Sequence, residues 1–236
     1  MSEAAPVVVV TGAASGLGRA SAMRLIDDGY DVVGFDRAGA PDHGPDCICG
    51  DLRSADDRNR VVEETNARPG PLVGMVNAAG VSPYVGPLVE IPSSRWELTY
   101  DVNVTGLFEL TRDCLPLFNN GGSIVNVASI GPRRAEHPVG AYSSSKSAVI
   151  QLTRQLAHEL GERQIRVNSI SPGVHETPMA DAYFDDPDQV ASLEASIPLG
   201  RIGRPQDVAA CAAWLLSDES SYITGAEIVI DGGLSL

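Results

Sequence analysis

Tyr142 and Lys146 are two side chains that could together move a proton, because they lie four residues apart in a segment with helical periodicity. That spacing places both on one face of a helix. A free tyrosine has a pKa of about 10, and a nearby ammonium stabilises the phenolate and lowers that pKa. Proton transfer is most effective when the pKa approaches the working pH. The pair therefore predicts an acid–base centre at Tyr142.

Lys146 is also the only lysine of the chain: the sequence has 17 lysine and arginine residues together, and all the others are arginines. An ammonium suits the predicted centre better than a guanidinium, because it is a compact charge with three rotatable donors. An exposed tyrosine with an unrelated lysine one turn away would show the same spacing. An arginine-rich codon bias would also explain why other lysines are missing.

Ser129 is a further candidate, because it ends a β-branched run that predicts a strand just upstream of Tyr142. A hydroxyl there can donate a hydrogen bond to a substrate oxygen as negative charge develops on it. Taken alone, a serine at this position is more often a cap at the end of a strand.

The stretch "TGAASGLG" (residues 11–18) follows one predicted strand and opens a predicted helix. Glycines at 12, 16 and 18 permit a tight turn and a close approach of the backbone to a ligand. The helix N-terminus presents free N–H groups and a positive dipole end to a pyrophosphate. A glycine-rich turn that binds nothing is the alternative.

Asp36 ends the second predicted strand, where a carboxylate can accept hydrogen bonds from the hydroxyls of an adenosine ribose and repel a 2′-phosphate. Arg37 complicates this, since an arginine can accommodate that phosphate. Asp36 holds the first position past the strand and Ser15 is not basic, so we expect NAD rather than NADP. A solvated carboxylate at the end of a strand is the alternative.

Apolar runs alternate with amphipathic segments along the whole chain. The runs predict about seven strands, at residues 7–11, 31–36, 47–51, 72–77, 123–129, 165–171 and 226–233. Helices are predicted at residues 16–28, 96–118, 141–161 and 205–217. Continuous apolar strands alternating with helices predict an α/β fold, a doubly wound parallel sheet with helices on both faces. We expect one domain over residues 1–236, with a cofactor half to about residue 130 and a catalytic half from about 131.

Composition narrows the possible partners. A formal net charge of −14 disfavours nucleic acid and anionic membranes, which require a basic face. The four cysteines form no CxxC pair, and no His/Cys cluster has the spacing of a zinc site, so no metal is expected. The N-terminus lacks a basic segment and a long apolar run, and we expect a cytoplasmic protein with reduced cysteines.

Together these residues resemble the short-chain dehydrogenase/reductase family over essentially the whole chain. The resemblance rests on seven ordered motifs: "TGAASGLG" (11–18), "NAAG" (77–80), "NVTG" (103–106), "VASI" (127–130), "YSSSK" (142–146), "SPG" (171–173) and "ITGAEIVIDGG" (223–233). It implies a single-domain Rossmann fold, a homo-oligomer (tetramer or dimer) and a small-molecule substrate.

The resemblance also implies residue roles. Tyr142 would be the acid/base, Lys146 would hold the nicotinamide ribose and lower the tyrosine pKa, and Ser129 would orient the substrate carbonyl. Asn103 would support a water that relays protons through Lys146. The implied cofactor-binding residues are Gly12, Ser15, Gly16, Leu17, Gly18, Asp36, Arg37, Asp51, Leu52, Asn77, Ala78, Gly80, Tyr142, Lys146, Pro172, Gly173, Val174 and Thr177.

One departure from the family pattern is "GVHETPM" (173–179), where His175 and Glu176 are larger and more polar than expected. They could face substrate, although we favour a solvated loop. Arg133, Arg134 and His137 could recognise a carboxylate, but solvated arginines are the more common case. Residues 177–199 read as a mobile lid.

We therefore expect an NAD(H)-dependent oxidoreductase that interconverts a secondary alcohol and its ketone, with a cyclic skeleton or an acid group as options for the substrate. A 3-oxoacyl thioester (acyl-carrier-protein) reductase would use the same four catalytic residues, although Asp36 and Ser15 disfavour its usual NADPH. A non-catalytic NAD-binding regulatory protein is the alternative of a different class, and the intact Tyr142 and Lys146 speak against it.

Overall fold

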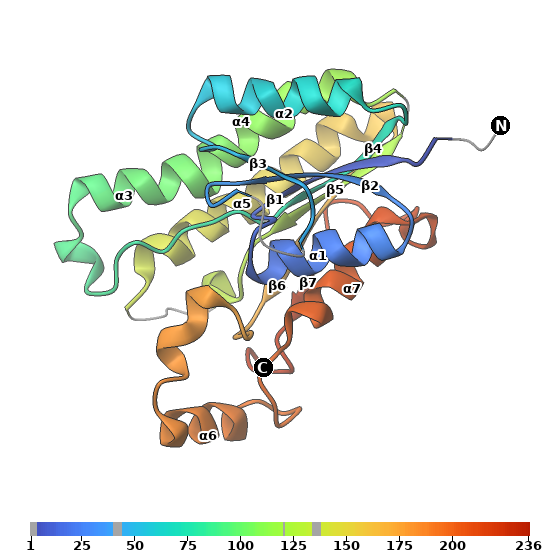
Figure 1. The fold of residues 1–236 in the computed structure, drawn as a ribbon. Coiled ribbons are helices and arrows are strands. Elements are labelled where there is room, and N and C mark those ends of the chain that lie inside the picture. Colours follow the sequence, from blue (N-terminus) through green and yellow to red (C-terminus); the bar gives the residue numbers. More distant parts are fainter. Residues whose placement is uncertain (1–3, 40–43, 120, 134–137) are drawn as a thin grey trace.

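A parallel sheet forms the centre of the chain in the computed structural model, which describes residues 4–39, 44–119, 121–133 and 138–236. The sheet has seven strands in these ranges, in the order β3-β2-β1-β4-β5-β6-β7 (Figure 1). They are β1 (Val7–Thr11), β2 (Asp31–Asp36), β3 (Cys47–Cys49), β4 (Leu72–Asn77), β5 (Gly122–Val127), β6 (Ile165–Pro172) and β7 (Glu227–Ile230). The predicted doubly wound α/β fold is confirmed.

The apolar runs form strands that are covered on both faces. In β1, Val7 and Val9 pack into one core cluster, whereas Val8 and Val10 pack into a second cluster on the opposite face. Side chains alternate along a strand, so a run of four valines needs a helical layer on each side of the sheet.

Seven α-helices in the described ranges supply these layers and their connections. They are α1 (Gly16–Asp27), α2 (Ala55–Ala67), α3 (Ser93–Tyr100), α4 (Leu107–Cys114), α5 (Gly140–Leu160), α6 (Pro187–Ser196) and α7 (Pro205–Leu216). The core on one face receives side chains from α2, α4 and α5, and the core on the other face receives side chains from α1 and α7. Figure 1 shows these two layers on opposite sides of the sheet, with α6 projecting away from it.

The predicted helix over 96–118 is divided into several pieces. After α3, residues Asp101–Gly106 form a π-helical stretch, α4 follows, and a 3-10 turn at Leu115–Leu117 ends the segment. A Cβ on Gly106 would lie 2.8 Å from Leu52 Cβ, so this glycine allows the stretch to pack closely on the residues after β3. Such stretches are frequently found at functional sites, and this one carries Asn103.

The sheet order fixes where a ligand can bind. From β1 the chain proceeds outward to β2 and β3, and it then returns to place β4 on the other side of β1. Adjacent connections diverge at such a switch point and leave a crevice outside the carboxyl ends of the strands. The glycine-rich turn after β1 and the residues after β4 meet there, since Thr11 Oγ1 accepts a hydrogen bond from Ala79 N at 3.1 Å.

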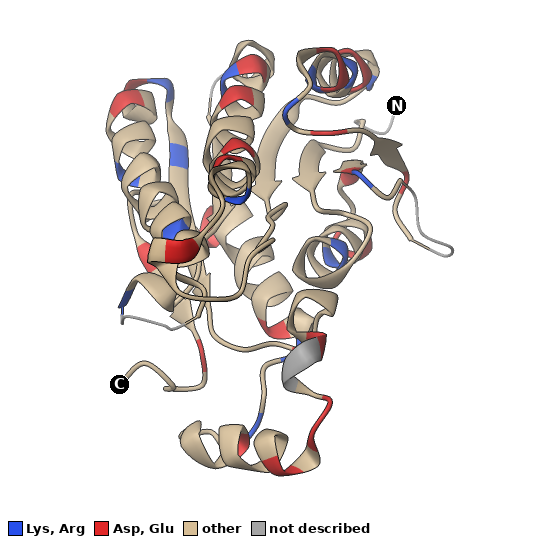
Figure 2. Ribbon diagram, turned by 90° about the vertical axis from the view of Figure 1, so that its left-hand side faces the viewer, with Lys and Arg blue, Asp and Glu red and all other residues tan. Residues whose placement is uncertain are grey.

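Most charged residues lie on the helices and loops around the sheet (Figure 2). No helix in the described part of the chain is both long enough and apolar enough to cross a membrane. The four cysteines are free thiols.

Candidate active site

A cleft of about 1010 Å³ lies at the carboxyl ends of β1, β2, β4, β5 and β6. It is lined by eighteen of the twenty predicted site residues: Gly12, Ser15, Gly16, Leu17, Gly18, Asp36, Arg37, Asp51, Leu52, Ala78, Gly80, Ser129, Tyr142, Lys146, Pro172, Gly173, Val174 and Thr177. The other two, Asn77 and Asn103, do not line it.

The glycine-rich turn is shaped so that only glycine fits at its tightest points. Gly12 and Gly16 have φ of 72° and 52°, in the left-handed region that favours glycine. A Cβ on Gly18 would lie 2.2 Å from Gly12 O, and a Cβ on Gly12 would lie 2.9 Å from Ala79 N. The turn delivers the chain to the N-terminus of α1, which faces the cleft with unsatisfied backbone N–H groups. These residues therefore fit the pyrophosphate of a dinucleotide.

The Asp36 carboxylate is held at the edge of this turn. Its Oδ2 accepts a hydrogen bond from Ala14 N at 3.1 Å, and its Oδ1 accepts one from Ala38 N at 2.9 Å. Asp51 also lines the cleft, but the Arg53 guanidinium binds its carboxylate at 2.6 Å and lowers the pKa of Asp51. Both acids can accept hydrogen bonds from an adenosine in this end of the cleft.

The Lys146 ammonium lies in the floor of the cleft. The residue is 2% exposed, its Nζ donates a 2.7 Å hydrogen bond to Val127 O, and its Nζ lies 5.6 Å from the centroid of the Tyr142 ring. Gly80 leaves room for it, since a Cβ there would lie 3.3 Å from Nζ. Burial lowers the pKa of Lys146 to about 8.

Asn103 stabilises the position of the Tyr142–Lys146 pair through hydrogen bonds outside the cleft. Its Oδ1 accepts a hydrogen bond from Val81 N at 2.7 Å, and its Nδ2 donates to Val81 O and to Ser145 Oγ, each at 3.0 Å. Ser145 Oγ in turn donates to Tyr142 O at 2.7 Å. The side chain of Asn103 therefore links the segment after β4 to the turn of α5 that carries the predicted acid–base pair.

Ser129 lies two residues beyond the end of β5, on the cleft wall. Its Oγ accepts a hydrogen bond from Gly131 N at 3.1 Å. The hydroxyl hydrogen is thus available to donate, as the stabilisation of a substrate oxygen requires.

Asn77 lies inside the sheet, at 2% exposure. Its Nδ2 donates to Asn126 Oδ1 at 2.9 Å and to Thr111 Oγ1 at 3.1 Å. Asn126 Nδ2 continues the chain of hydrogen bonds to Thr153 Oγ1 on α5 at 2.9 Å. This side chain therefore ties β4 to the helices α4 and α5.

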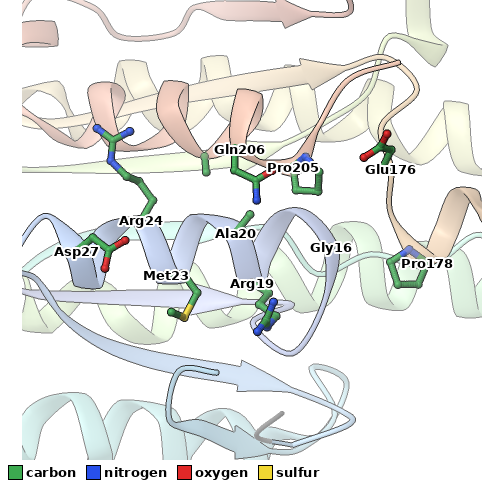
Figure 3. A pocket seen from close by; sticks show the side chains of 11 residues that line it. Gly16, Arg19, Ala20, Met23, Arg24, Asp27, Glu176, Pro178, Pro205 and Gln206 are labelled. Atoms are coloured by element: carbon green, nitrogen blue, oxygen red, sulfur yellow. The ribbon is translucent and has the colours of Figure 1, made fainter. Parts of the chain in front are cut away.

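The other residues considered for substrate contact lie in different places. Arg133 does not line the cleft, and its Nε lies 3.2 Å from Glu227 Oε1. Arg134 and His137 lie outside the described residues. Glu176 lines a separate groove of about 380 Å³ between α1 and α7, which Figure 3 shows from close by.

The favoured reading of His175 as part of a solvated loop is wrong. The side chain is 4% exposed, lines the cleft wall, and lies 3.1 Å from Gly173 O through Nδ1. Burial lowers its pKa. Its backbone pairs with Gly203, a residue distant in sequence, which explains why local composition suggested exposure.

A further part of the cleft wall was identified from sequence only as loops. It is lined by apolar side chains and one amide, namely Val85, Pro138, Val139, Met179, Leu193 and Gln189. Two of these lie on α6, within the segment expected to cover the site. Nothing in the spacing of α6 residues distinguishes a helix that lines a cleft from one that lies on the surface.

No group of three or more potential metal ligands gathers in the part of the chain that is described. The groups that the cleft presents to a substrate include the phenol of Tyr142, the ammonium of Lys146 and the hydroxyl of Ser129. These groups can transfer a proton to or from a substrate oxygen beside a bound dinucleotide.

Comparisons with known proteins agree with this geometry. A family model described as enoyl-(acyl carrier protein) reductase matches residues 12–235. The chain is 35% identical over 241 residues to dehydrogenase/reductase SDR family member 4 of Bos taurus, covering 96% of this chain and 86% of that protein. It is 35% identical over 242 residues to the 3-oxoacyl-[acyl-carrier-protein] reductase of Thermotoga maritima, covering 97% of each.

Among solved structures, the ligand-free aldohexose dehydrogenase of Thermoplasma acidophilum superposes with a TM-score of 0.91. The two are 31% identical, and the superposition covers 98% of this chain and 94% of the other. The chain is therefore similar to these proteins in both sequence and fold.

Replacing Lys146 with methionine should stabilise the cofactor-free protein at pH 7. Lowering the pKa from 10.5 to about 8 means that burying the ammonium costs about 3 kcal/mol, and the substitution removes this cost. Losing the hydrogen bond to Val127 O offsets roughly 1 kcal/mol of that gain. We expect Lys146→Met to be about 2 kcal/mol more stable in urea unfolding.

The sign of the pH dependence follows from proton binding. Between pH 8 and 10.5 the unfolded chain holds the lysine proton more tightly than the folded chain, so the wild-type protein gains stability as pH rises through this window. The difference in free energy of unfolding between Lys146→Met and the wild-type protein should therefore be smaller at pH 10 than at pH 7. A constant difference would show that the ammonium is not penalised by burial.

Proposed function

Because the chain belongs to the short-chain dehydrogenase/reductase family and is an oxidoreductase that acts on CH–OH groups, we propose that it is an NAD(H)-dependent enzyme that interconverts a secondary alcohol and its ketone. The observation that carries the proposal is the shared cleft. The glycine-rich turn and Asp36 line one part of it, and Tyr142, Lys146 and Ser129 line another.

The proposed proton chemistry belongs to Tyr142. In the direction of reduction its hydroxyl donates a proton to the substrate oxygen, and in the direction of oxidation the phenolate accepts one. The ammonium of Lys146, one turn away and 5.6 Å from the ring centroid, favours the phenolate. Ser129 donates a hydrogen bond to the same oxygen. When bound, the nicotinamide ring supplies or accepts the hydride.

Asn103 has a positioning role in this proposal. Both its amide hydrogens and its carbonyl are used by Val81 and Ser145. Its side chain therefore maintains the distance between the wall after β4 and the turn of α5. A proton relay through a water near Lys146, as the family resemblance implies, stays a prediction.

Asp36 supports NAD as the cofactor. A carboxylate held by Ala14 N and Ala38 N faces the position of the adenosine ribose, where it accepts hydrogen bonds from hydroxyls and repels a 2′-phosphate. Arg37 lines the same end of the cleft and is exposed. The cofactor preference therefore depends on the balance between these two neighbouring residues.

A 3-oxoacyl thioester reductase is the second candidate, supported by the description of the matching family model and by the Thermotoga maritima relative. Asp36 and the absence of a basic side chain at position 15, which is Ser15, weigh against the NADPH that such a reductase would use. Assembly into two or four copies and a cytoplasmic location stay predictions.

A substrate screen tests the reaction class directly. The measurement is NADH formation at alkaline pH across secondary alcohols, sugars, steroids and alicyclic diols, with NADPH oxidation by a 3-oxoacyl thioester as the competing assay. Turnover confined to the thioester would favour the second candidate.

Replacing Tyr142 with phenylalanine should remove the proton donor and leave the binding site intact. We expect kcat on the best substrate of the screen to fall by about 10²–10⁴-fold, with the Kd for NADH within about twofold of the wild-type value because the ring is retained. Full turnover by Tyr142→Phe would contradict the assigned acid/base.

Replacing Asp36 with asparagine should shift the cofactor preference. Hydrogen bonds to a charged group contribute about 1.5–3 kcal/mol, so kcat/KM with NAD should fall roughly 10–100-fold, while kcat/KM with NADP rises. The added substitution Arg37→Ala is the matched control, and it should cancel the gain with NADP. A wild-type enzyme that prefers NADP would refute the assignment.

Replacing Arg133 with alanine should leave the preference between acidic and neutral substrates unchanged, because Arg133 is paired with Glu227 outside the cleft. The KM ratio for matched acidic and neutral substrates should change by less than about twofold. Arg154→Ala is the control, since Arg154 Nη2 lies 3.8 Å from the same carboxylate. A selective rise in KM for the acid would restore Arg133 as a recognition residue.

A further inference from the structure

His175 is a buried titratable group for which the proposed chemistry has no role. Nδ1 lies 3.1 Å from Gly173 O, and a carbonyl can only accept, so Nδ1 carries the proton. Nε2 is then the unprotonated nitrogen of a neutral ring. It is buried without a hydrogen-bond partner among the described residues.

The ring of His175 packs against Gly203, and we call the space it occupies there the seat. A Cβ on Gly203 would lie 2.5 Å from both Cδ2 and Nε2 of His175, so the ring occupies the space that any larger residue would need. The backbones interlock on either side: Gly203 N donates to Val174 O at 3.1 Å, and Glu176 N donates to Gly203 O at 2.9 Å. The imidazole and these two hydrogen bonds hold the segment around His175 against the segment around Gly203.

The segment around His175, residues 173–177, forms part of the cleft wall. Gly173 and Val174 line the cleft, whereas Thr177 reaches the glycine-rich turn, where a Cβ on Gly16 would lie 3.4 Å from Thr177 Cβ. Figure 3 shows the chain from Glu176 to Pro178 running beside the start of α7, at Pro205, and the start of α1, at Gly16.

Gly203 lies in the turn before α7, which is held by contacts to Asp207. Asp207 accepts a hydrogen bond from Arg204 N at 2.8 Å and pairs with Arg201 Nη1 at 2.8 Å. This closes the turn that precedes α7. His175 therefore connects a wall of the cleft to the turn before α7.

We propose that His175 is a positioning residue for the dinucleotide: its neutral imidazole, seated between Gly173 O and Gly203, holds residues 173–177 in the conformation that binds the cofactor, and acid pH releases them. The inference rests on the proposed function, because it requires a cleft that binds a dinucleotide. It assigns a role to a residue at which the chain departs from its family pattern.

The surroundings of the ring explain why acid should release it. The charged groups facing His175 are Asp207 in the first turn of α7, Arg201 in the segment before α7, and Asp231 just after β7. Asp207 is neutralised by Arg201, and the Asp231 carboxylate already accepts from two backbone N–H groups at 2.8 Å. A second N–H on the seated ring would lack an acceptor, which is costly in a buried position.

The direction of the pH effect follows. Burial lowers the pKa of seated His175 from its ordinary 6.5. Below pH 6.5 the released ring therefore binds a proton that the seated ring resists, and the seated conformation loses population as pH falls. One proton limits the loss of cofactor affinity to about tenfold per pH unit.

The test compares the Kd for NADH of three proteins by fluorescence titration at pH 7.5 and 5.5. His175→Asn keeps an N–H donor near the Nδ1 position and does not titrate, whereas His175→Val keeps a branched apolar side chain and no donor. At pH 7.5 we expect wild type and His175→Asn to bind within about threefold of each other, and His175→Val to bind about five- to tenfold more weakly.

At pH 5.5 the wild-type affinity should fall by twofold to tenfold relative to His175→Asn, because only wild type takes up a proton at this site. An equal pH dependence in wild type and His175→Asn would overturn the proposal. So would equal affinities of all three proteins at pH 7.5. If His175→Val does not fold, the comparison of wild type with His175→Asn across pH still decides.

A second measurement, thermal unfolding without cofactor, tests the seat itself. Gly203→Ala should lower Tm in the wild-type background and have little effect in the His175→Val background, where the ring is absent. Additive effects would show that the ring does not occupy the seat and would overturn the proposal. Absence of any NADH or NADPH binding by wild type at pH 7.5 would instead refute the proposed function.

Discussion

The interaction on which the site depends is the hydrogen bond from the buried Lys146 ammonium to the carbonyl of Val127. It fixes α5 against the end of β5 and thereby sets the distance from the phenol of Tyr142 to the wall that carries Ser129. A buried cation with one backbone acceptor is unfavourable in the cofactor-free protein. The large apolar cores on both faces of the sheet must outweigh this cost.

A buried polar ladder keeps α5 in place despite that cost. Asn77, Asn126 and Thr153 join β4, β5 and α5 through hydrogen bonds of 2.9 Å, and parallel register places Asn77 directly beside Asn126. Polar groups buried this deeply stabilise one arrangement only, because any shift of register or of helix leaves them unpaired. The orientation of the acid–base pair is therefore set by residues that never reach the cleft.

The sequence was sufficient to predict residues that line the cleft where those residues lie close together in the chain. The glycine-rich turn, Asp36 and the Tyr142–Lys146 pair were predicted because each combines a strand end or a helix turn with a local spacing. It was insufficient where partners lie far apart. The pairing of His175 with Gly203, the ion pair of Arg133 with Glu227 and the π-helical stretch around Asn103 all depend on tertiary contacts that no local pattern encodes.

The burial of the only lysine has a practical consequence for covalent labelling. Reagents that acylate amines normally modify many surface lysines, but this chain has a single side-chain amine, and it is 2% exposed. Apart from the N-terminus, every acylation event would report the accessibility of one nitrogen in the cleft floor. The rate of that reaction therefore measures how often solvent reaches the floor of the cleft.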